Sequence, residues 1–398
     1  MARDAKTSAV VIGLNINGLA VARALGRHGV PVTVAALDAR VHEAHSRYIR
    51  DVWPCANFCG DLVRVLLDRR AAFTEAPVLI PVTDQAVRTL AANKTDLEQA
   101  YRFAMPTPDL VDALLDKAAF AALAGKLGQP TPQTFMVERP EEMPAVARQV
   151  RYPCILKPRA KSPTYSQAGG KKAYVLDSAQ DLRNTYDRVA PAAEGGMVIQ
   201  EYIPGSDELV HFCLQYYSRD SRALASFCGR KIRQWPPHCG GTACCQPLAI
   251  DELVHRSTAF FQAIGFHGLC SMEFKLDPRD GGFRLIEPTV CRTDWQSGVA
   301  DLNGVPIAYV AYCDLTGRPL PRLRSKRHRV RWVNFAGDRK SAAYYRQRGL
   351  LSLGGWLASL RPPVRGAYLA GDDPMPWLSI MGEKFIRRLL PGRWSDAS

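Results

Sequence analysis

The sequence predicts an α/β region, then an α+β region and finally a basic C-terminal extension. Over the first hundred residues, short apolar runs rich in Val and Ile alternate with helical patterns, which is typical of a parallel sheet covered by helices. Further along, several strand patterns follow one another directly, which is typical of antiparallel hairpins. With 398 residues, 47% of them hydrophobic and 23% charged, the chain is long enough for two or three domains with their own cores.

The N-terminal region begins as a strand, a glycine turn, a helix and a second strand, which is the order of a Rossmann-like fold. A later buried strand brings Thr83, Asp84 and Gln85 to its carboxyl end, where open α/β sheets meet their ligands. The expected elements are a strand over 9–14, a turn over 13–18, a helix to residue 25, and strands over 32–37 and 78–81.

The glycine turn allows two interpretations. Its spacing, Gly13-x-x-x-x-Gly18, lacks the second glycine of the dinucleotide fingerprint. A dinucleotide bound here would place a ribose near Asp38, and the chain would be an NAD(P)-dependent oxidoreductase. A turn that only packs tightly within a Rossmann-like scaffold is the favoured interpretation.

The α+β region opens with a helix and continues with strands separated by polar turns. Asp109 caps the expected helix, which runs to about Leu127 and stops at Gly128. Strands are expected over 133–137, 154–157, 173–176, 197–202, 209–217, 223–233, 268–276 and 282–287, and helices over 179–189 and 251–264. The strands over 209–217 and 223–233, and the last two strands, are expected to form hairpins.

Two lysines of this region suit an anionic ligand. Lys157 ends an apolar strand, where a cation is costly unless an anion such as a nucleotide phosphate lies nearby. Lys117 lies on the helix that opens the region, and a polar glycine-bearing loop over 162–172 follows Lys157. The alternative for Lys157 is a side chain that simply reaches water from the strand end.

The segment Gln200-Glu201-Tyr202-Ile203 runs into a Pro-Gly hinge, and Glu208 follows seven residues after Glu201. Such a strand end exposes backbone amides and carbonyls that suit the edge of an adenine. Glu201 is placed to accept a hydrogen bond from the exocyclic amine, and Glu208 to accept from ribose hydroxyls. The alternative is a hinge between subdomains that carries two solvated carboxylates.

Glu273 and Glu287 are expected to face each other on two paired strands. Two neighbouring carboxylates repel each other, and a divalent cation relieves that repulsion. Because no His or Cys pair lies nearby in the sequence, these hard oxygen ligands suit Mg²⁺ bridging phosphates, not zinc. The alternative is a pair of edge carboxylates with salt-bridge partners in Lys275 and Arg284.

These residues, in this order along the chain, resemble the ATP-grasp superfamily. Residues 287–294, Glu-Pro-Thr-Val-Cys-Arg-Thr-Asp, also resemble its predicted carboxylate–amine ligase branch, near D-aspartate ligase. The resemblance spans about residues 1–317. It implies a Rossmann-like pre-ATP-grasp domain over 1–106, an ATP-grasp domain over 107–317 with subdomains over about 107–195 and 196–317, and a basic, Trp-containing extension over 318–398.

The resemblance also implies a role for each matched residue, with ATP and Mg²⁺ bound, or Mn²⁺ as an alternative metal. Arg292 would hold the substrate carboxylate or its acyl phosphate, and either Lys231 or Arg233 would neutralise the phosphate being transferred. The other expected ligands are Lys117 and Lys157 for the ATP phosphates, Gln200, Glu201, Tyr202 and Ile203 for adenine, Glu208 for ribose, and Glu273, Glu287 and Thr289 for the metal.

The implied reaction joins a small-molecule carboxylate to an amine. ATP would phosphorylate the carboxylate to an acyl phosphate, because oxide is too poor a leaving group, and the amine would then displace phosphate to give an amide and ADP. Thr289 stands where many members of the superfamily have Asn. This departure leaves the metal to two carboxylates and water, or else indicates a non-catalytic ATP-binding protein.

Most of the net charge of +14 lies in the extension, since residues 318–398 hold 17 of the 52 Lys and Arg but only 5 of the 38 Asp and Glu. The nearly neutral body therefore does not indicate a specific nucleic-acid partner. For the extension, packing on the body is the favoured interpretation, peripheral contact with an anionic membrane the second and RNA the third.

Eleven cysteines, an odd number scattered along the chain, favour a reducing cytoplasm over a disulfide framework. The first fifteen residues lack a signal-peptide pattern, and no segment reaches the roughly 18 apolar residues of a membrane span. A zinc site at His42, His45, Cys55 and Cys59 is the minor alternative to ordinary loop residues.

Overall fold

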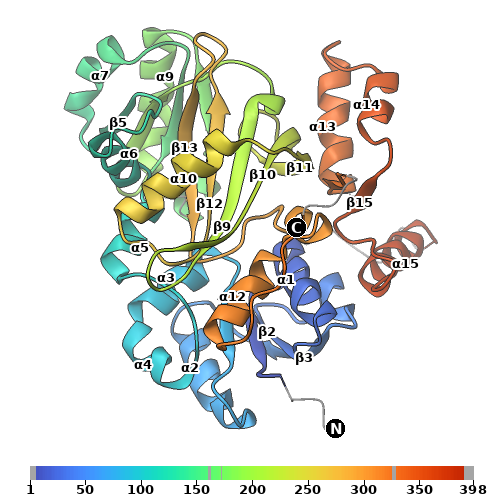
Figure 1. The fold of residues 1–398 in the computed structure, drawn as a ribbon. Helices are drawn as coiled ribbons and strands as arrows, with labels where there is room; N and C mark the ends of the chain where they lie inside the picture. The colour runs from blue at the N-terminus through green and yellow to red at the C-terminus, as the bar shows by residue number, and fades with distance from the viewer. Residues whose placement is uncertain (1–5, 160–162, 172, 325–328, 390–398) are drawn as a thin grey trace.

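The computed structural model describes residues 6–159, 163–171, 173–324 and 329–389, which form three sheets flanked by helices (Figure 1). The first sheet, in the order β3-β2-β1-β4, is parallel throughout and confirms the strand–turn–helix–strand prediction. Its elements are β1 (Ala9–Ile12), α1 (Ile16–Arg27), β2 (Val32–Ala36), η1 (His42–His45), β3 (Ile49–Pro54), α2 (Gly60–Arg69), β4 (Val78–Pro81), α3 (Asp84–Ala92) and α4 (Lys94–Ala100).

The second sheet is small and antiparallel, in the order β5-β8-β6-β7. It has an apolar core of its own, in which Leu156 and Ile199 of the strands meet Leu182 of a covering helix. Its elements are β5 (Thr134–Val137), α7 (Met143–Gln149), β6 (Cys154–Pro158), α8 (Pro163–Gln167), β7 (Tyr174–Leu176), α9 (Ala179–Val189) and β8 (Met197–Glu201).

Two details of this sheet bear on the expectations. Strand β8 pairs with β5 and β6, so it lies with the strands of the first expected subdomain, whose end was expected at about residue 195. The glycine-bearing loop expected over 162–172 contains the short helix α8, while residues 160–162 and 172 lie outside the described residues.

The third sheet has seven strands in the order β13-β12-β9-β10-β11-β14-β15 and contains both predicted hairpins. It shares its core with the N-terminal sheet, so that Val34 of β2 and Phe212 of β9 lie in one apolar cluster. Its elements up to the extension are η5 (Asp207–Leu209), β9 (Val210–Tyr217), β10 (Ala223–Trp235), β11 (Gly241–Pro247), α10 (Asp251–Ala263), β12 (Gly268–Leu276), β13 (Phe283–Val290), α11 (Gly298–Leu302) and α12 (Ile307–Leu315).

The single helix expected over 109–127 is divided into α5 (Pro108–Leu115) and α6 (Lys117–Lys126). Asp116 between them is extended, and its carboxylate accepts hydrogen bonds from the backbone N–H groups of Ala118 and Ala119. The same carboxylate lies 2.5 Å from Arg159, which begins the loop after β6. An Asp that can cap a new helix competes with the helix interior, and here the cap prevails.

The C-terminal extension is built into the body, as the packing interpretation predicts for the part of it that is described. Strand β14 pairs with β11, and helix α13 packs on β10 and β11, beside the third sheet in Figure 1. A buried ion pair of 2.8 Å between Arg23 and Asp373 ties the end of the extension to α1. The elements are β14 (Arg331–Val333), α13 (Phe335–Gln347), α14 (Leu353–Ser359), β15 (Val364–Gly366) and α15 (Met375–Leu389).

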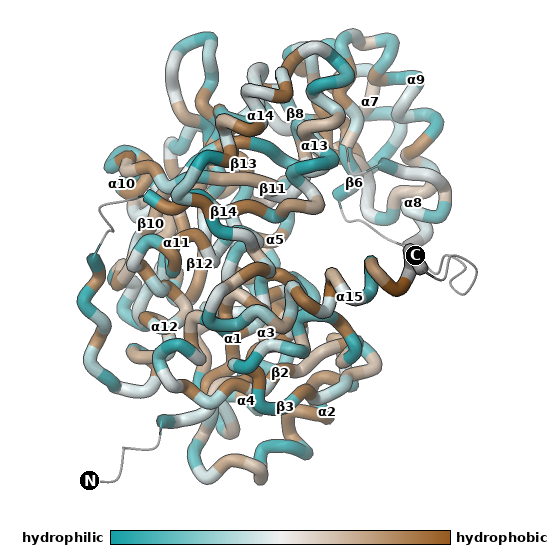
Figure 2. The backbone as a smooth tube through the Cα atoms, turned by 90° about the vertical axis from the view of Figure 1, so that its right-hand side faces the viewer, coloured by the Kyte–Doolittle hydropathy of each residue, from teal (hydrophilic) through white to brown (hydrophobic). Residues whose placement is uncertain are grey.

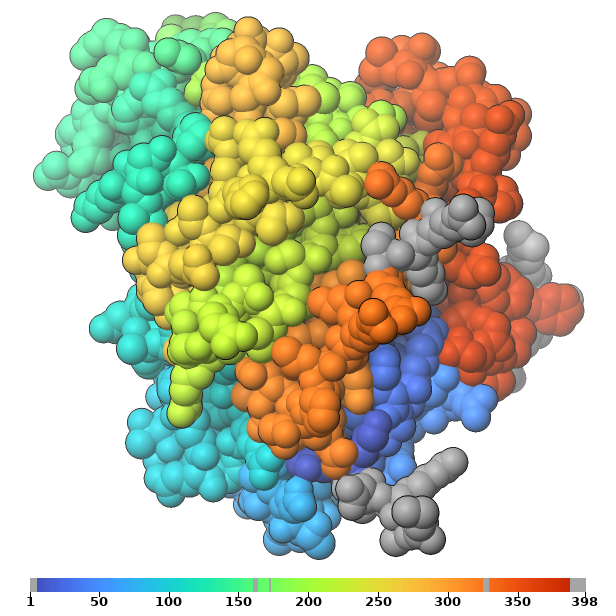
Figure 3. Space-filling view, in the orientation of Figure 1, coloured from blue at the N-terminus to red at the C-terminus, as the bar shows by residue number. Residues whose placement is uncertain are grey.

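The extension makes two separate contacts with the body. Figure 3 shows its red residues in two groups at the right edge, one beside the large sheet and the other beside the N-terminal domain. The second group includes α15, which packs on η1 and whose hydrophobic segments are visible in Figure 2. No helix in the described part of the chain is long and apolar enough to cross a membrane.

Candidate nucleotide site

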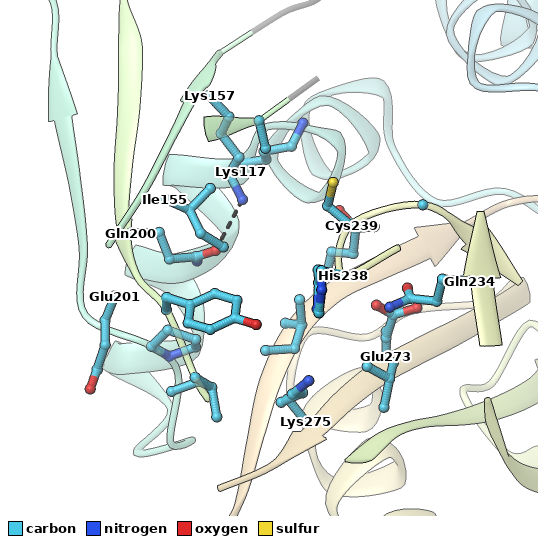
Figure 4. A pocket seen from close by; sticks show the side chains of 18 of the residues that line it. Lys117, Ile155, Lys157, Gln200, Glu201, Gln234, His238, Cys239, Glu273 and Lys275 are labelled. Atoms are coloured by element: carbon cyan, nitrogen blue, oxygen red, sulfur yellow. Dashed lines mark hydrogen bonds between the residues drawn. The ribbon is translucent and has the colours of Figure 1, made fainter. Parts of the chain in front are cut away.

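A cavity of about 390 Å³ lies between the small sheet and the large sheet (Figure 4). Its volume is in the range of small-molecule sites. Figure 4 shows Lys117 and Lys157 on one side, Glu273 and Lys275 on the other, and His238 and Cys239 between them. Eight of the predicted site residues line it: Lys117, Lys157, Gln200, Glu201, Tyr202, Ile203, Glu273 and Glu287.

The small sheet supplies a lysine held by an amide. Lys157 Nζ donates to Gln200 Oε1 at 3.0 Å, and Gln200 Nε2 donates to Thr134 Oγ1 at 2.9 Å. The strands bring these groups together because β6 and β8 are antiparallel neighbours, with Ile155 opposite Gln200. Lys157 and Ile155 are two residues apart on β6, so both face the cavity. A polyanion in the cavity would therefore meet a cation that is already oriented.

Glu201 points away from the cavity, because side chains alternate along a strand and Gln200 points in (Figure 4). Its buried carboxylate lies 2.7 Å from Arg279, which belongs to the turn between β12 and β13. The side chain expected to meet adenine thus links two elements behind the cavity, and Gln200 occupies the inward position. Glu208, expected at the ribose, is half-exposed, lies 3.4 Å from Arg230 and does not line the cavity.

The large sheet supplies the acidic wall. Glu273 and Glu287 are directly opposite each other in the register of β12 and β13, as predicted. Lys231 Nζ lies 2.5 Å from Glu273 Oε2. Burial raises the pKa of Glu273 above its ordinary value in spite of Lys231, and the Glu287 charge raises it further. Burial alone would lower the pKa of Lys231, but the Glu273 carboxylate raises it, so the lysine keeps its charge.

Two carboxylates facing each other, Glu273 partly buried and Glu287 exposed at the cavity, fit a hard divalent cation, which would relieve the repulsion that helps to raise the pKa of Glu273. Thr289, the third expected ligand, lies opposite Ser271 on the same strand pair and does not line the cavity. In the described ranges, no group of three or more His, Cys, Asp and Glu side chains is arranged to hold a metal. The candidate site therefore offers two protein ligands, and the zinc interpretation of His42, His45, Cys55 and Cys59 is not supported.

The three residues expected to act on the substrate or the transferred phosphate, Lys231, Arg233 and Arg292, all lie outside the cavity lining. Arg233 is buried against Asp338 of α13 at 2.6 Å, since a bulge in β10 between Lys231 and Arg233 separates their directions. Of the two alternatives for the transferred phosphate, Lys231 is the one beside the acidic pair. Arg292 lies 2.6 Å from Asp84 of the N-terminal domain, so it joins two parts of the chain.

Lys275 is a cavity residue that the sequence argument assigned only as a salt-bridge partner of Glu273. It follows Glu273 by two positions on β12, so the strand period places both on one face. Its Nζ donates to the carbonyl oxygens of Gly205 and Ser206 in the hinge after β8, at 3.2 and 3.0 Å. Burial lowers its pKa. Gln234, His238 and Cys239 also line the cavity, although none of them was among the predicted site residues. Gln234 is near the end of β10, and the other two lie in the loop between β10 and β11.

The glycine turn is filled by the protein itself. A Cβ on Gly18 would lie 2.2 Å from the carbonyl oxygen of Gly13. The buried Asn17 donates to the Thr293 carbonyl at 2.7 Å and accepts from the hydroxyls of Thr293 and Ser297 at 2.6 and 2.9 Å. The loop after β13 therefore covers the turn, and Asp38 is an exposed side chain bonded to Arg40. These contacts support the packing interpretation over the dinucleotide one.

Comparison with known proteins finds relatives in sequence but no matching family model. D-aspartate ligase of Enterococcus faecium (strain Aus0004) is 23% identical over 265 residues, which cover 63% of this chain and 61% of that protein. The C-terminal section of the carbamoyl phosphate synthase large chain of Methanopyrus kandleri is 24% identical over 259 residues, covering 63% of this chain and 43% of that protein. The matched segments thus span less than two thirds of either relative.

Solved structures match more of the chain. An ADP complex of purK, N5-carboxyaminoimidazole ribonucleotide synthetase, aligns with a TM-score of 0.66 and 15% identity over 87% of both chains. The chain has the ATP-grasp fold. An L-amino acid ligase from Bacillus licheniformis aligns with a TM-score of 0.59 and 15% identity over 79% of this chain and 75% of that one. The ATP-grasp resemblance predicts a nucleotide between two α+β subdomains, and the cavity lies between two such parts.

Proposed function

We propose that this ATP-grasp protein is a ligase that uses ATP to activate a small-molecule carboxylate and joins it to an amine. The observation that carries the proposal is one cavity with two lysines on one wall and Glu273 opposite Glu287 on the other. Behind that wall, the buried Lys231 pairs with Glu273. Cations suit the phosphates of ATP, and paired carboxylates suit the cation that accompanies it.

The proposed roles follow from position. Lys117 and Lys157 contact the ATP phosphates, while adenine lies against Gln200 and the backbone through Ile203. Glu273 and Glu287 hold Mg²⁺, or Mn²⁺, which when bound neutralises phosphate charge and orients the phosphate oxygens. Lys231, already beside Glu273, stabilises the charge that develops on the transferred phosphoryl group.

In the first step a carboxylate oxygen attacks the γ-phosphorus of ATP, and the bond to the bridging oxygen of ADP breaks. In the second step the amine attacks the acyl carbon, phosphate leaves with its bonding electrons, and the amine loses a proton as the amide forms. No covalent nucleophile of the protein is needed, so the side chains act by positioning and charge. Arg292 is the proposed contact of the substrate carboxylate; it lies outside the cavity lining and pairs with Asp84, so a substrate would have to replace that carboxylate.

Thermal unfolding with Mg·ATP, Mg·ADP, NAD⁺ and NADPH tests the nucleotide part of this proposal. A ligand that binds only the folded chain raises the midpoint. We expect Mg·ATP to stabilise the wild type and the Lys126→Ala control, whose lysine ends α6 on an exposed surface, but not Lys157→Ala. Stabilisation by a nicotinamide cofactor alone would overturn the proposal. Release of ADP with pairs of acids and amines then tests the ligase step.

A non-catalytic ATP-binding protein is the second candidate, and Thr289 favours it. With Thr at this position, two carboxylates are the metal ligands that the cavity offers. Tight binding of Mg·ATP without release of ADP across many pairs of acids and amines would favour this candidate. We place either activity in the cytoplasm, because ATP is available there and the eleven cysteines are free thiols.

For the extension we propose peripheral contact with an anionic membrane in addition to packing. Apolar side chains are exposed on both of its outer helices, at Leu353 and Leu357 of α14 and at Phe385 and Ile386 of α15. The net positive charge of residues 318–398 would attract anionic headgroups. Sedimentation with phosphatidylserine vesicles should decrease as salt is raised. Equal binding to neutral phosphatidylcholine vesicles, or none to either, would contradict the proposal.

A further inference from the structure

Helix α13 of the C-terminal extension approaches the loop between β10 and β11, which forms one side of the nucleotide cavity. The helix and the loop both contact Asp207. This carboxylate is only 2% exposed and accepts four hydrogen bonds. Oδ1 accepts from Gln234 Nε2 at 3.0 Å and from the His238 N–H at 3.1 Å. Oδ2 accepts from the Gln234 N–H and from the Tyr345 hydroxyl, both at 2.9 Å. Three of the bonds thus hold the end of β10 and the loop that follows it, and the fourth comes from α13.

The loop is held in a conformation that the sequence alone does not favour. His238 has a φ of 68°, in the left-handed region that costs a non-glycine residue about 1 kcal/mol or more. Asp207 binds the backbone N–H of this residue, and the rings of Tyr344 and Tyr345 approach its imidazole edge-on at 6.4 and 5.9 Å between centroids. Strained backbone persists where its surroundings determine it, and such sites concentrate where ligands bind.

The Asp207 carboxylate is also connected by hydrogen bonds to the acidic wall of the cavity. Gln234, fixed by Asp207, accepts a hydrogen bond from Lys231 Nζ at 3.0 Å, and Lys231 lies 2.5 Å from Glu273. A continuous set of polar contacts therefore runs from Tyr345 through Asp207, Gln234 and Lys231 to the proposed metal ligand. Every group in it except the Tyr345 hydroxyl belongs to the large sheet or the segments adjoining it.

A second contact fixes α13 on the same strand. Asp338 of α13 lies 2.6 Å from the buried Arg233 and also accepts from the Trp356 indole N–H at 2.8 Å. Because both contacts involve the last residues of β10 or the loop that follows it, α13 cannot shift without moving Arg233 or, through Asp207, Gln234 and His238. The position of the extension is thus coupled to the cavity wall.

We infer that Tyr345 is a positioning residue of the nucleotide site and that α13 makes the extension part of that site. Through Asp207, Tyr345 fixes His238, which lines the cavity, and Gln234, which holds Lys231 beside the metal ligand Glu273. The inference rests on the proposed function, since it concerns how the cavity binds Mg·ATP. Burial and the Asp207 charge raise the pKa of Tyr345, and its hydroxyl remains protonated and able to donate.

Tyr345→Phe tests this inference, with Tyr368→Phe as the matched control. Tyr368 is another half-buried tyrosine of the extension, and its hydroxyl donates to the carboxylate of Glu43 at 2.7 Å, outside the cavity lining. Both variants lose one hydrogen bond to a carboxylate, so both should lower the midpoint of thermal unfolding by similar amounts. Only Tyr345→Phe should weaken Mg·ATP binding in calorimetry, by about tenfold.

The outcomes separate the inference from the proposed function. If the wild type does not bind Mg·ATP, both fail. If the wild type binds and Tyr345→Phe binds as tightly as Tyr368→Phe, the inference alone is overturned. A third variant, His238→Gly, distinguishes a role of the His238 imidazole from a role of its backbone conformation. Glycine adopts the left-handed conformation without strain. Weaker Mg·ATP binding without a lower midpoint of unfolding would therefore show that the imidazole contacts the nucleotide. Unchanged Mg·ATP binding in His238→Gly would mean that α13 affects the nucleotide site through Lys231 and not through the His238 side chain.

Discussion

The glycine turn of the N-terminal domain and the cavity between the two sheets both follow apolar strands and both carry polar residues suited to a nucleotide. The structure treats them in opposite ways. At the turn, protein atoms fill the space: Asn17 makes three short hydrogen bonds with Thr293 and Ser297, which lie in the segment after β13. At the cavity, cations and carboxylates from two sheets surround an open volume of about 390 Å³. What packs over a motif decides whether it can bind a ligand.

The comparison is also one of electrostatics. At the turn, neutral amide and hydroxyl groups form hydrogen bonds with one another, so these groups do not need a charged ligand as a partner. Glu273, in contrast, is partly buried opposite Glu287, and burial raises its pKa although Lys231 is in contact. Buried charge that its neighbours only partly compensate is typical of functional sites. We therefore expect substitutions in the cavity to change ligand binding, and substitutions of similar size at the turn to change stability.

The largest effect should come from Glu287→Gln in the cavity. Replacing one of two carboxylate ligands removes a full charge from the proposed Mg²⁺ site, and we expect Mg·ATP affinity to fall by about 100-fold, or about 2.7 kcal/mol. Isothermal titration calorimetry measures it. The control is Glu252→Gln on α10, which removes an exposed partner of Arg256 and should leave affinity unchanged. Equal affinity in both variants would remove Glu287 from the site.

The next largest effect should appear at the turn, as a loss of stability and not of binding. In Gly18→Ala the new Cβ would meet the Gly13 carbonyl oxygen, and we expect the free energy of unfolding to fall by about 2 kcal/mol. Urea denaturation measures this loss. Gly125→Ala on α6 is the control, because nothing lies within 4 Å of its Cβ position and a helical Ala should stabilise slightly. Weaker NAD⁺ binding in Gly18→Ala, at unchanged stability, would reverse the comparison.

The pH dependence of Mg·ATP binding should sharpen the electrostatic difference. Mg²⁺ needs Glu273 ionised, and because burial raises the pKa of Glu273, protonation begins above its ordinary value of 4.5. Affinity should therefore fall as the pH is lowered, approaching tenfold per pH unit below the raised pKa. Comparing the slope with that of Glu273→Gln separates this carboxyl from the protonation of ATP itself. Equal slopes in the two proteins would mean that Glu273 does not titrate with the metal.

Much of the local structure could be predicted from the sequence, because it is set by periodicity and caps. The helix over Ala179–Val189 and the strand over Gly268–Leu276 begin and end at the predicted residues. The opposition of Glu273 and Glu287 followed from two strands joined by a short turn. The break between α5 and α6 at Asp116 could not be predicted in this way. The Asp116 carboxylate caps the new helix and also pairs with Arg159, which is distant in the sequence.

The remaining differences concern partners and directions that no local pattern contains. Whether Gln200 or Glu201 faces the cavity depends on the pairing of β8 with β5 and β6. The bulge after Lys231 sends Arg233 to Asp338, more than a hundred residues away in the sequence. The joining of β14 to β11 depends on tertiary pairing in the same way. Long-range contacts thus determine which side chains face the cavity and which strands pair, and the local sequence does not determine either.

The smallest effect should come from Asp38, the residue that would bind a ribose if the turn were a dinucleotide site. Its carboxylate is exposed, and its contacts are the backbone N–H and side chain of Arg40, two residues on. An exposed pair of this kind contributes little, so Asp38→Asn should change the free energy of unfolding by less than about 0.5 kcal/mol. Mg·ATP affinity should be unchanged as well. A variant that binds NAD⁺ more weakly than the wild type would place a ligand at the turn, and the contacts of Asn17 would then have to open to admit it.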